Sequence, residues 1–182
     1  MATLLKETSL AQLGEQLQGA LHYDEIHKKL YSTDASVYRE APIAVAYPKD
    51  KRDIQLLINY AEENNIPLIP RTAGTSLGGQ VVGKGIIVDV SKHFSQIIEL
   101  NTEEKWVKVQ PGVIRDDLNR YLQPYGLMFA PETSTSNRAM IGGMVGNNSC
   151  GTYSIVYGTT RNHVLEIEGF LSDGSLVKFG DL

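Results

Sequence analysis

Two glycine-rich segments contain the residues best suited to chemistry. The first, PRTAGTSLGG at 70–79, directly follows an apolar run that is typical of a buried strand. Small residues let the main chain approach a ligand closely, and successive main-chain N–H groups can form a concave anion site. This composition favours a pyrophosphate site, with a plain glycine turn as the alternative.

The second segment spans 131–151 and is rich in Ser, Thr, Asn and Gly. Ordering so long a polar loop costs conformational entropy, so loops of this length usually have a function. We therefore expect it to contact a ligand; the alternative is a long surface loop. Within it, Cys150 is more consistent with a small packed side chain than with redox chemistry or covalent cofactor attachment.

A competing phosphate motif overlaps the first segment, because Gly78 to Lys84 has the spacing G-x-x-x-x-G-K. A nucleoside-triphosphate loop continues with Ser or Thr, whose hydroxyl binds magnesium, and lies between a strand and a helix. Here Gly85 follows, and no helix is indicated. We reject this interpretation.

The sequence gives little support for a metal site, for nucleic-acid binding or for a transmembrane segment. His22, His27, His93 and His163 show no metal-ligand spacing, so we expect no metal site, and a single cysteine cannot ligate an iron–sulfur cluster alone. A formal net charge of −4 without a basic run gives no reason to expect nucleic-acid binding. Since neither a signal peptide nor a long apolar run is evident, we expect a cytoplasmic chain without a transmembrane segment.

The elements before and around the first segment indicate a strand–helix–strand order. We expect an opening helix capped by Ser9, with Leu10, Leu13, Leu17 and Leu21 on its apolar face. PIAVAY at 42–47 then predicts a buried strand. Asp50 should cap a helix that ends at Asn64 and Asn65 and has Ile54, Leu57, Ile58 and Ala61 on one face. IPLIP at 66–70 then predicts a second buried strand. This order is typical of a parallel crossover.

The rest of the chain indicates antiparallel structure. Three short strand-like runs lie at 85–90, 96–100 and 105–110, the last two joined by a turn-like NTEE. A helix should follow Gly112, with Ile114, Leu118, Tyr121 and Leu122 on one face, and stop near Pro124 and Gly126. Runs at 163–171 and 175–179 flank an Asp-Gly step that suits a hairpin.

Taken together, these segments resemble the vanillyl-alcohol oxidase and p-cresol methylhydroxylase flavoproteins. PRTAGTSLGG is similar to their first FAD loop and IGGMVGNNSCG to their second, and the YSTDASVYREAP, VQPGV and HVLEIEGFLSDGS segments match as well. Among these flavoproteins the sequence is most similar to the FAD-linked D-lactate dehydrogenase and glycolate oxidase type. Thr72 and Ala73 replace two commonly seen glycines, and Met144 stands where Asn is frequent.

This resemblance implies an α+β, two-layer FAD-binding domain: a small parallel α/β subdomain at about 1–90 and a mostly antiparallel subdomain at about 91–182. It implies FAD contacts at Arg71, Thr72, Ala73, Gly74, Thr75, Ser76 and Leu77 for the pyrophosphate. It further implies contacts at Gly142, Gly143, Gly146, Asn147, Gly151, Ile167 and Gly169 for the rest of the cofactor.

The activity implied is oxidation of a small 2-hydroxy acid, such as D-lactate or glycolate, by hydride transfer to flavin N5. The family's cap domain and closing glycine segment do not occur before Leu182, so we expect a C-terminally truncated chain that is inactive alone, with an iron–sulfur module as a possible downstream partner. No catalytic residue is assigned. Two alternatives stay open: a reductase of the UDP-N-acetylenolpyruvylglucosamine type, and a flavin-binding module without catalysis.

Overall fold

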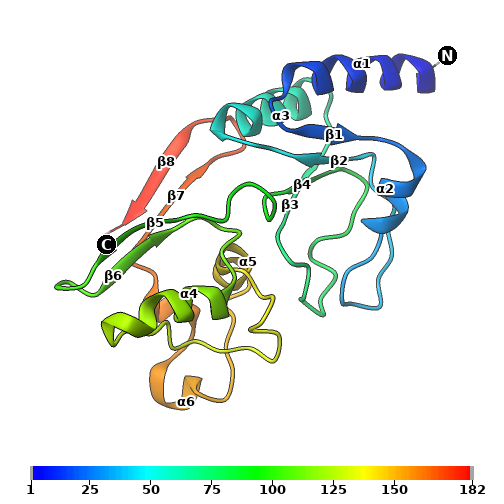
Figure 1. Ribbon diagram of the computed structural model, residues 1–182. Coiled ribbons are helices and arrows are strands. Elements are labelled where there is room, and N and C mark those ends of the chain that lie inside the picture. Colours follow the sequence, from blue (N-terminus) through cyan, green and yellow to red (C-terminus); the bar gives the residue numbers. More distant parts are fainter. Residues whose placement is uncertain (1, 181–182) are drawn as a thin grey trace.

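The computed structural model describes residues 2–180 and contains three sheets (Figure 1). The strands are β1 (Ala20–His22), β2 (Ala44–Tyr47), β3 (Leu68–Arg71), β4 (Ile86–Asp89), β5 (Ile97–Asn101), β6 (Trp106–Val109), β7 (Glu166–Phe170) and β8 (Leu176–Gly180). The helices are α1 (Ala2–Gln16), α2 (Glu25–Leu30), α3 (Lys51–Glu63), α4 (Arg115–Leu122), α5 (Ile141–Gly146) and α6 (Ser154–Tyr157), with the 3-10 turns η1 (Gln123–Tyr125) and η2 (Thr160–His163). The expected combination of a small parallel α/β part with antiparallel hairpins is confirmed.

The largest sheet has the strand order β1-β2-β4-β3. Strand β4 lies in the middle, is buried along its whole length and pairs in parallel with both β2 and β3, while β1 runs antiparallel to β2. The crossover from β2 through α3 to β3 thus skips one strand position. As a result β3 is an edge strand, half-buried with Pro70 exposed, and the expectation that it is buried was wrong. An edge position also tolerates the missing N–H of Pro70.

Helix α3 starts and ends where its local signals predict. The Asp50 side chain accepts a hydrogen bond from Asp53 N at 2.9 Å, and Asn64 forms the C-terminal cap. Leu57, Ile58 and Ala61 are buried as expected. Ile54 is only partly buried, however, and the fully buried residue of the first turn is Asp53.

Helix α1 begins earlier than expected. Ser9 lies inside it rather than at its N-cap, and the Ser9 hydroxyl donates to Tyr60 Oη of α3 at 3.1 Å. Leu21 belongs to β1 rather than to the helix. The main core lies where the α1 and α3 helices cover the sheet (Figure 1). Its buried members are Leu10, Leu13, Leu17, Ala44, Ala46, Leu57, Ile66, Ile86 and Val88.

A second core lies beneath the β5–β6 hairpin, which is antiparallel as expected. Its buried members, Val113, Leu118 and Leu122, come from α4 and the turn before it. Tyr121, which was expected on the same face as Leu118 and Leu122, is 41% exposed and does not belong to this core. Gly126 ends the helical segment with a φ of 67°.

The β7–β8 pair forms the expected hairpin, with Gly174 in its turn at a φ of 78°. It approaches the parallel part through an ion pair between Lys51 of α3 and Glu168 of β7. Lys51 also holds the pKa of Glu168 below its ordinary value, by hydrogen bonding and by its charge. Within residues 2–180, no helix combines the length and apolar character needed to span a membrane.

Candidate functional site

The first glycine-rich segment leaves β3 and turns at Gly74, whose φ is 63°. A side chain there would be strained, and its Cβ would lie 2.9 Å from Arg71 Nη2. In the described part of the chain, the main-chain N–H groups from Ala73 to Leu77 make no hydrogen bond with other protein groups. Consecutive N–H groups that are free of protein acceptors suit an anionic ligand such as a pyrophosphate.

The YSTDAS segment at 31–36 is hydrogen-bonded to this loop. Gly74 O accepts a hydrogen bond from Ala35 N at 3.1 Å, and Arg71 Nη1 donates to Thr33 O at 3.0 Å. The Arg71 guanidinium also lies 4.9 Å from the centroid of the Tyr31 ring. Arg71 is therefore fixed in place by groups outside the loop, which pre-organises its charge beside the free N–H groups.

Tyr31 is itself anchored to the end of the central strand. Its hydroxyl donates to Asp89 Oδ2 at 2.6 Å and accepts from Tyr47 Oη at 2.9 Å. Burial, followed by the hydrogen bonds to Asp89 and Tyr47, raises the pKa of Tyr31 well above its ordinary value. Tyr31 therefore stays protonated and acts as a hydrogen-bond donor, and it connects Arg71 to the end of β4.

The second segment is more ordered than expected, because it contains α5 instead of being irregular throughout. The helix starts on the VQPGV turn: Ile141 N donates to Val113 O at 2.9 Å and Gly142 N donates to Pro111 O at 2.8 Å. A Cβ on Gly142 would lie 2.4 Å from Pro111 Cβ. Glycine at 142 therefore permits the close approach of the second segment to the turn.

The two glycine-rich segments are linked by side-chain hydrogen bonds. Gln80 Nε2, just past the first segment, donates to Asn147 Oδ1 at the end of α5 at 2.9 Å, and the Ser76 hydroxyl hydrogen-bonds Gln80. A Cβ on Gly143 would lie 2.6 Å from Thr72 Oγ1. Residues predicted for one ligand from two distant parts of the sequence are thus brought together. Gln80 was not predicted, and only its position directly after the segment could have indicated it.

Polar and open positions beside the two segments fit a large polar ligand. Two buried acceptor atoms have no hydrogen-bond partner among the described residues. They are Asp34 Oδ2, one residue before the Ala35 that hydrogen-bonds Gly74, and Glu132 Oε2 at the start of the second segment. Such atoms require donors, and FAD carries hydroxyl and N–H groups. Gly146, the residue before Asn147, is exposed and has no atom within 4 Å of the position of a Cβ, so it leaves open space at the end of α5. The residues present fit FAD.

The remaining residues predicted to contact FAD lie away from the junction of Gln80 and Asn147. Leu77 is 77% exposed at the tip of the first segment, and Gly151 packs against the main chain of Glu132, where a Cβ would be 2.4 Å from the carbonyl oxygen. Ile167 and Gly169 lie on β7, in the third sheet. Cys150 is exposed at the end of the second segment, so the expectation that it is a packed side chain was wrong.

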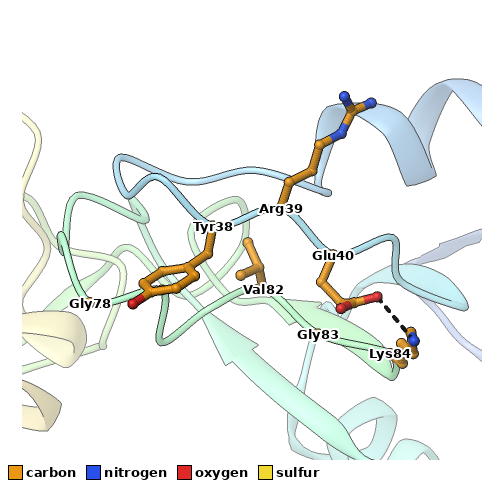
Figure 2. A pocket seen from close by; sticks show the side chains of 8 residues that line it. Tyr38, Arg39, Glu40, Gly78, Val82, Gly83 and Lys84 are labelled. Carbon is orange, nitrogen blue, oxygen red and sulfur yellow. Dashed lines mark ion pairs between the residues drawn. The ribbon is translucent and has the colours of Figure 1, made fainter.

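An open cavity of about 540 Å³ lies beside the first segment and is lined by Tyr38, Arg39, Glu40, Gly78, Gly79, Val82, Gly83 and Lys84 (Figure 2). Lys84 forms an ion pair with Glu40 at 3.5 Å, drawn as a dashed line in Figure 2. The stretch from Gly78 to Lys84 leads into strand β4 rather than a helix. The rejection of the nucleoside-triphosphate loop agrees with this geometry.

The expectation that the chain has no metal site stays a prediction, but two of the four histidines lie close together in the structure. His22 and His27 stack with Asp24 beside them, and one donor atom of each of the three side chains lies within 4.8 Å of the others. The short strand β1 and the turn into α2, neither of which was predicted, bring them together.

Comparison with solved structures defines the class of fold. p-Cresol methylhydroxylase with bound substrate matches 97% of this chain with a TM-score of 0.79 at 20% identity, over 35% of its own length. A second solved structure, Physcomitrella patens BBE-like 1, matches 94% of the chain with a TM-score of 0.79 at 20% identity, over 37% of its length. The fold is that of the p-cresol methylhydroxylase type of FAD-binding domain.

The family model described as FAD binding domain matches residues 42–180, and the chain belongs to this family. FAD is therefore its cofactor, as expected. D-2-hydroxyglutarate dehydrogenase of Escherichia coli is 46% identical over 149 residues, which cover 80% of this chain and 15% of that protein. Glycolate oxidase subunit GlcD of Bacillus subtilis is 34% identical, covering 91% of this chain and 36% of the subunit, and mitochondrial D-lactate dehydrogenase [cytochrome] of Kluyveromyces lactis is 36% identical, covering 76% and 24%. The chain thus spans well under half the length of these relatives.

Proposed function

We propose that this chain is the FAD-holding part of an oxidoreductase that acts on a 2-hydroxy acid. The relatives named above are called dehydrogenases or oxidases of D-2-hydroxyglutarate, D-lactate and glycolate, and all three substrates belong to this class. Bound FAD would supply the acceptor for the hydride that leaves the substrate Cα. The substrate within the class is the finer part of the proposal, and D-2-hydroxyglutarate, D-lactate and glycolate are the compounds to test.

The observation that carries the proposal is the junction of the two glycine-rich segments through Gln80 and Asn147. A single segment with free N–H groups would serve any small anion. Two segments that meet across 67 positions of sequence form one long site, which suits a nucleotide with an internal pyrophosphate.

The residues of this chain would bind and orient the cofactor. We assign the pyrophosphate to the N–H groups at 73–77 with Arg71 and Thr72 beside them, and the ribityl and phosphate contacts to Gly142, Gly143, Gly146 and Asn147. Gly151 would lie near the flavin ring, with Ile167 and Gly169 near the adenosine. The base that takes the hydroxyl proton and the group that clamps the substrate carboxylate are not assigned to this chain.

The organisation of the whole protein is also a proposal. We place the boundary between the parallel and antiparallel subdomains at about residue 90, at the end of β4. Since Cys150 is the only cysteine of the sequence, the cysteine ligands of an iron–sulfur module would come from outside these 182 residues.

Nucleotide binding tests the cofactor site directly. FAD and FMN are titrated into the purified chain while flavin fluorescence is followed, and FAD should bind more tightly because only FAD contains the internal pyrophosphate. Gly74→Val should weaken FAD binding several-fold or more, since it strains the turn and displaces Arg71. Lys84→Ala should have almost no effect. Tighter binding of FMN, or an equal loss in the two variants, would contradict the assignment.

Activity tests the proposed reaction. Dye reduction is measured with FAD and each of the three 2-hydroxy acids, on residues 1–182 and on the full-length gene product. We expect turnover only where the catalytic groups are present, and none from residues 1–182, because positioning the substrate Cα and accepting its hydroxyl proton need groups that we do not find here. Turnover by residues 1–182 at the full-length rate would overturn the proposal that this part only holds FAD.

A further inference from the structure

Three side chains outside the FAD site converge at the junction of β1 and α2. His22 is the last residue of β1, Asp24 is the N-cap of α2, and His27 lies in that helix, which gives the spacing H-x-D-x-x-H. Their donor atoms lie within 4.8 Å of one another. None of the contacts that hold the glycine-rich segments involves these residues, so the cluster needs an explanation of its own.

The capping role of Asp24 fixes its carboxylate. Asp24 Oδ1 accepts hydrogen bonds from Ile26 N and His27 N, both at 3.1 Å. The other oxygen, Oδ2, is thereby turned toward the imidazoles and lies 2.7 Å from His27 Nδ1 and 3.9 Å from His22 Nδ1. The main chain of the helix terminus thus orients one potential ligand oxygen before any ion binds.

The two imidazoles are also held. Their rings stack with centroids 3.9 Å apart and planes 9° from parallel, and the Tyr47 ring meets both edge-on at 5.6 and 6.5 Å. The His22 and His27 side chains retain 36% and 28% of their exposure, so solvent and ions can reach them. The stack places both imidazoles beside the Asp24 carboxylate.

We propose that His22, Asp24 and His27 form a binding site for a late first-row divalent metal ion, with Zn²⁺ as the reference ion. Two imidazole nitrogens and one carboxylate oxygen are a ligand set that Zn²⁺ and its neighbours prefer. Metal–ligand bonds of about 2.0–2.2 Å in a tetrahedral site put ligand atoms roughly 3.3 Å apart. Here His27 Nδ1 hydrogen-bonds Asp24 Oδ2 at 2.7 Å and His22 Nδ1 lies 3.9 Å from the same oxygen, so a bound ion would replace the proton of that hydrogen bond. Because stacked rings direct their nitrogen lone pairs side by side, both imidazoles would rotate out of the stack toward the ion, which leaves the fourth position for water.

The alternative is a capped helix with a stacked histidine pair and no ligand. The charges around the cluster separate the two explanations. Asp24 is its one carboxylate, and the exposed Lys92, whose Nζ lies 5.1 Å from the Tyr47 centroid, is the nearby cation that acts on His22. A bound divalent ion would be repelled by Lys92, so removing this charge should tighten metal binding, whereas a stacked pair without a metal predicts no such effect.

The experiment is titration of the purified chain, without a polyhistidine tag, with ZnCl₂ by calorimetry and with CoCl₂ by visible absorption. One ion per chain should bind, and Co²⁺ should give a d–d spectrum of a site with nitrogen and oxygen ligands. His22→Gln, His27→Gln and Asp24→Asn should each weaken binding at least about tenfold, since even the loss of outer-shell partners costs that much. Asn preserves the helix cap, so Asp24→Asn tests the ligand without removing the cap. Lys92→Gln should tighten binding.

His93→Gln is the matched control, because it removes a histidine outside the cluster and should leave Zn²⁺ affinity unchanged. Zn²⁺ should also raise the thermal unfolding temperature of the unsubstituted chain and of His93→Gln, but not that of the His22→Gln/His27→Gln double variant. Circular dichroism verifies that each variant is folded. Equal Zn²⁺ affinity in the unsubstituted chain and the double variant, or more than one equivalent bound without loss in any cluster variant, would overturn the proposal.

Discussion

The fully buried carboxylate of Asp53 in α3 accepts a hydrogen bond from the main-chain N–H of Gly19 at 2.9 Å. The same carboxylate also accepts from Gln18 N at 2.9 Å and from Lys49 N at 2.8 Å. One side chain therefore satisfies three main-chain donors that come from the two segments flanking β1 and β2. Helix α3 and the edge of the main sheet are joined at this point.

Asp53→Asn should lower the free energy of unfolding by about 2–3 kcal/mol, because an amide places its own N–H against a main-chain N–H that needs an acceptor. Urea unfolding followed by circular dichroism measures the change. Asp173→Asn, in the exposed hairpin turn, is the matched control and should change stability much less. Equal losses in the two variants would mean that the Asp53 hydrogen bonds do not stabilise the fold.

Tyr31→Phe should cost about 1–2 kcal/mol of stability, since it removes the donor to the buried Asp89 carboxylate and leaves that oxygen without it. It should also weaken FAD binding modestly, because the Tyr31 ring, which lies against the Arg71 guanidinium, loses the hydroxyl that anchors it to Asp89. Tyr125→Phe, at an exposed position, should change neither property. Unfolding and FAD titrations on the two variants give the answer, and a Tyr31→Phe protein with unchanged stability would contradict it.

Two glycines of α5 should respond differently to alanine. Gly142→Ala places a Cβ 2.4 Å from Pro111 Cβ, so we expect about 1–3 kcal/mol of destabilisation without ligand. Gly146→Ala meets no protein atom within 4 Å, so stability without FAD should be unchanged or slightly higher, while FAD affinity should fall if the cofactor occupies that space. Unchanged FAD affinity in Gly146→Ala would remove Gly146 from the site.

The link between α3 and β7 should depend on pH. Lys51 holds the pKa of Glu168 below its ordinary value, so the link stabilises the fold at neutral pH and is lost as the pH falls through that lowered pKa. An NMR titration of the Glu168 carboxyl should show this low pKa, and Lys51→Met should shift it upward. Since the pair is largely exposed, added salt should weaken the effect. A Glu168 pKa unaffected by Lys51→Met would exclude the link.

Local signals were sufficient wherever one residue decides a boundary. Asp50 predicted the start of α3, Asn64 its end, and Gly126 the end of the helical segment after α4, because capping and left-handed φ depend on side chains at those positions. The small-residue pattern likewise indicated both glycine-rich segments. Ser9 misled the prediction because a serine can also lie inside a helix when its hydroxyl has a tertiary partner, here Tyr60.

Features that depend on tertiary contacts could not be predicted from one sequence. Helix α5 is hidden by its glycines, and it forms because Pro111 and Val113 accept hydrogen bonds from its first residues. The place of β4 between β2 and β3 is set by strand order, which periodicity does not encode. The contact between Gln80 and Asn147 depends on how distant parts of the chain pack together. The stacking of His22 on His27 depends on the turn between β1 and α2.

The exposure of Cys150 has a practical consequence. It is the only thiol of the chain and lies at the end of the segment that contains α5, so a maleimide fluorophore would attach at a single known position beside the proposed cofactor site. Changes in the emission of that dye would report ligand binding independently of flavin fluorescence. The rate at which the thiol reacts, with and without FAD, would then measure how far the bound cofactor shields this end of the segment.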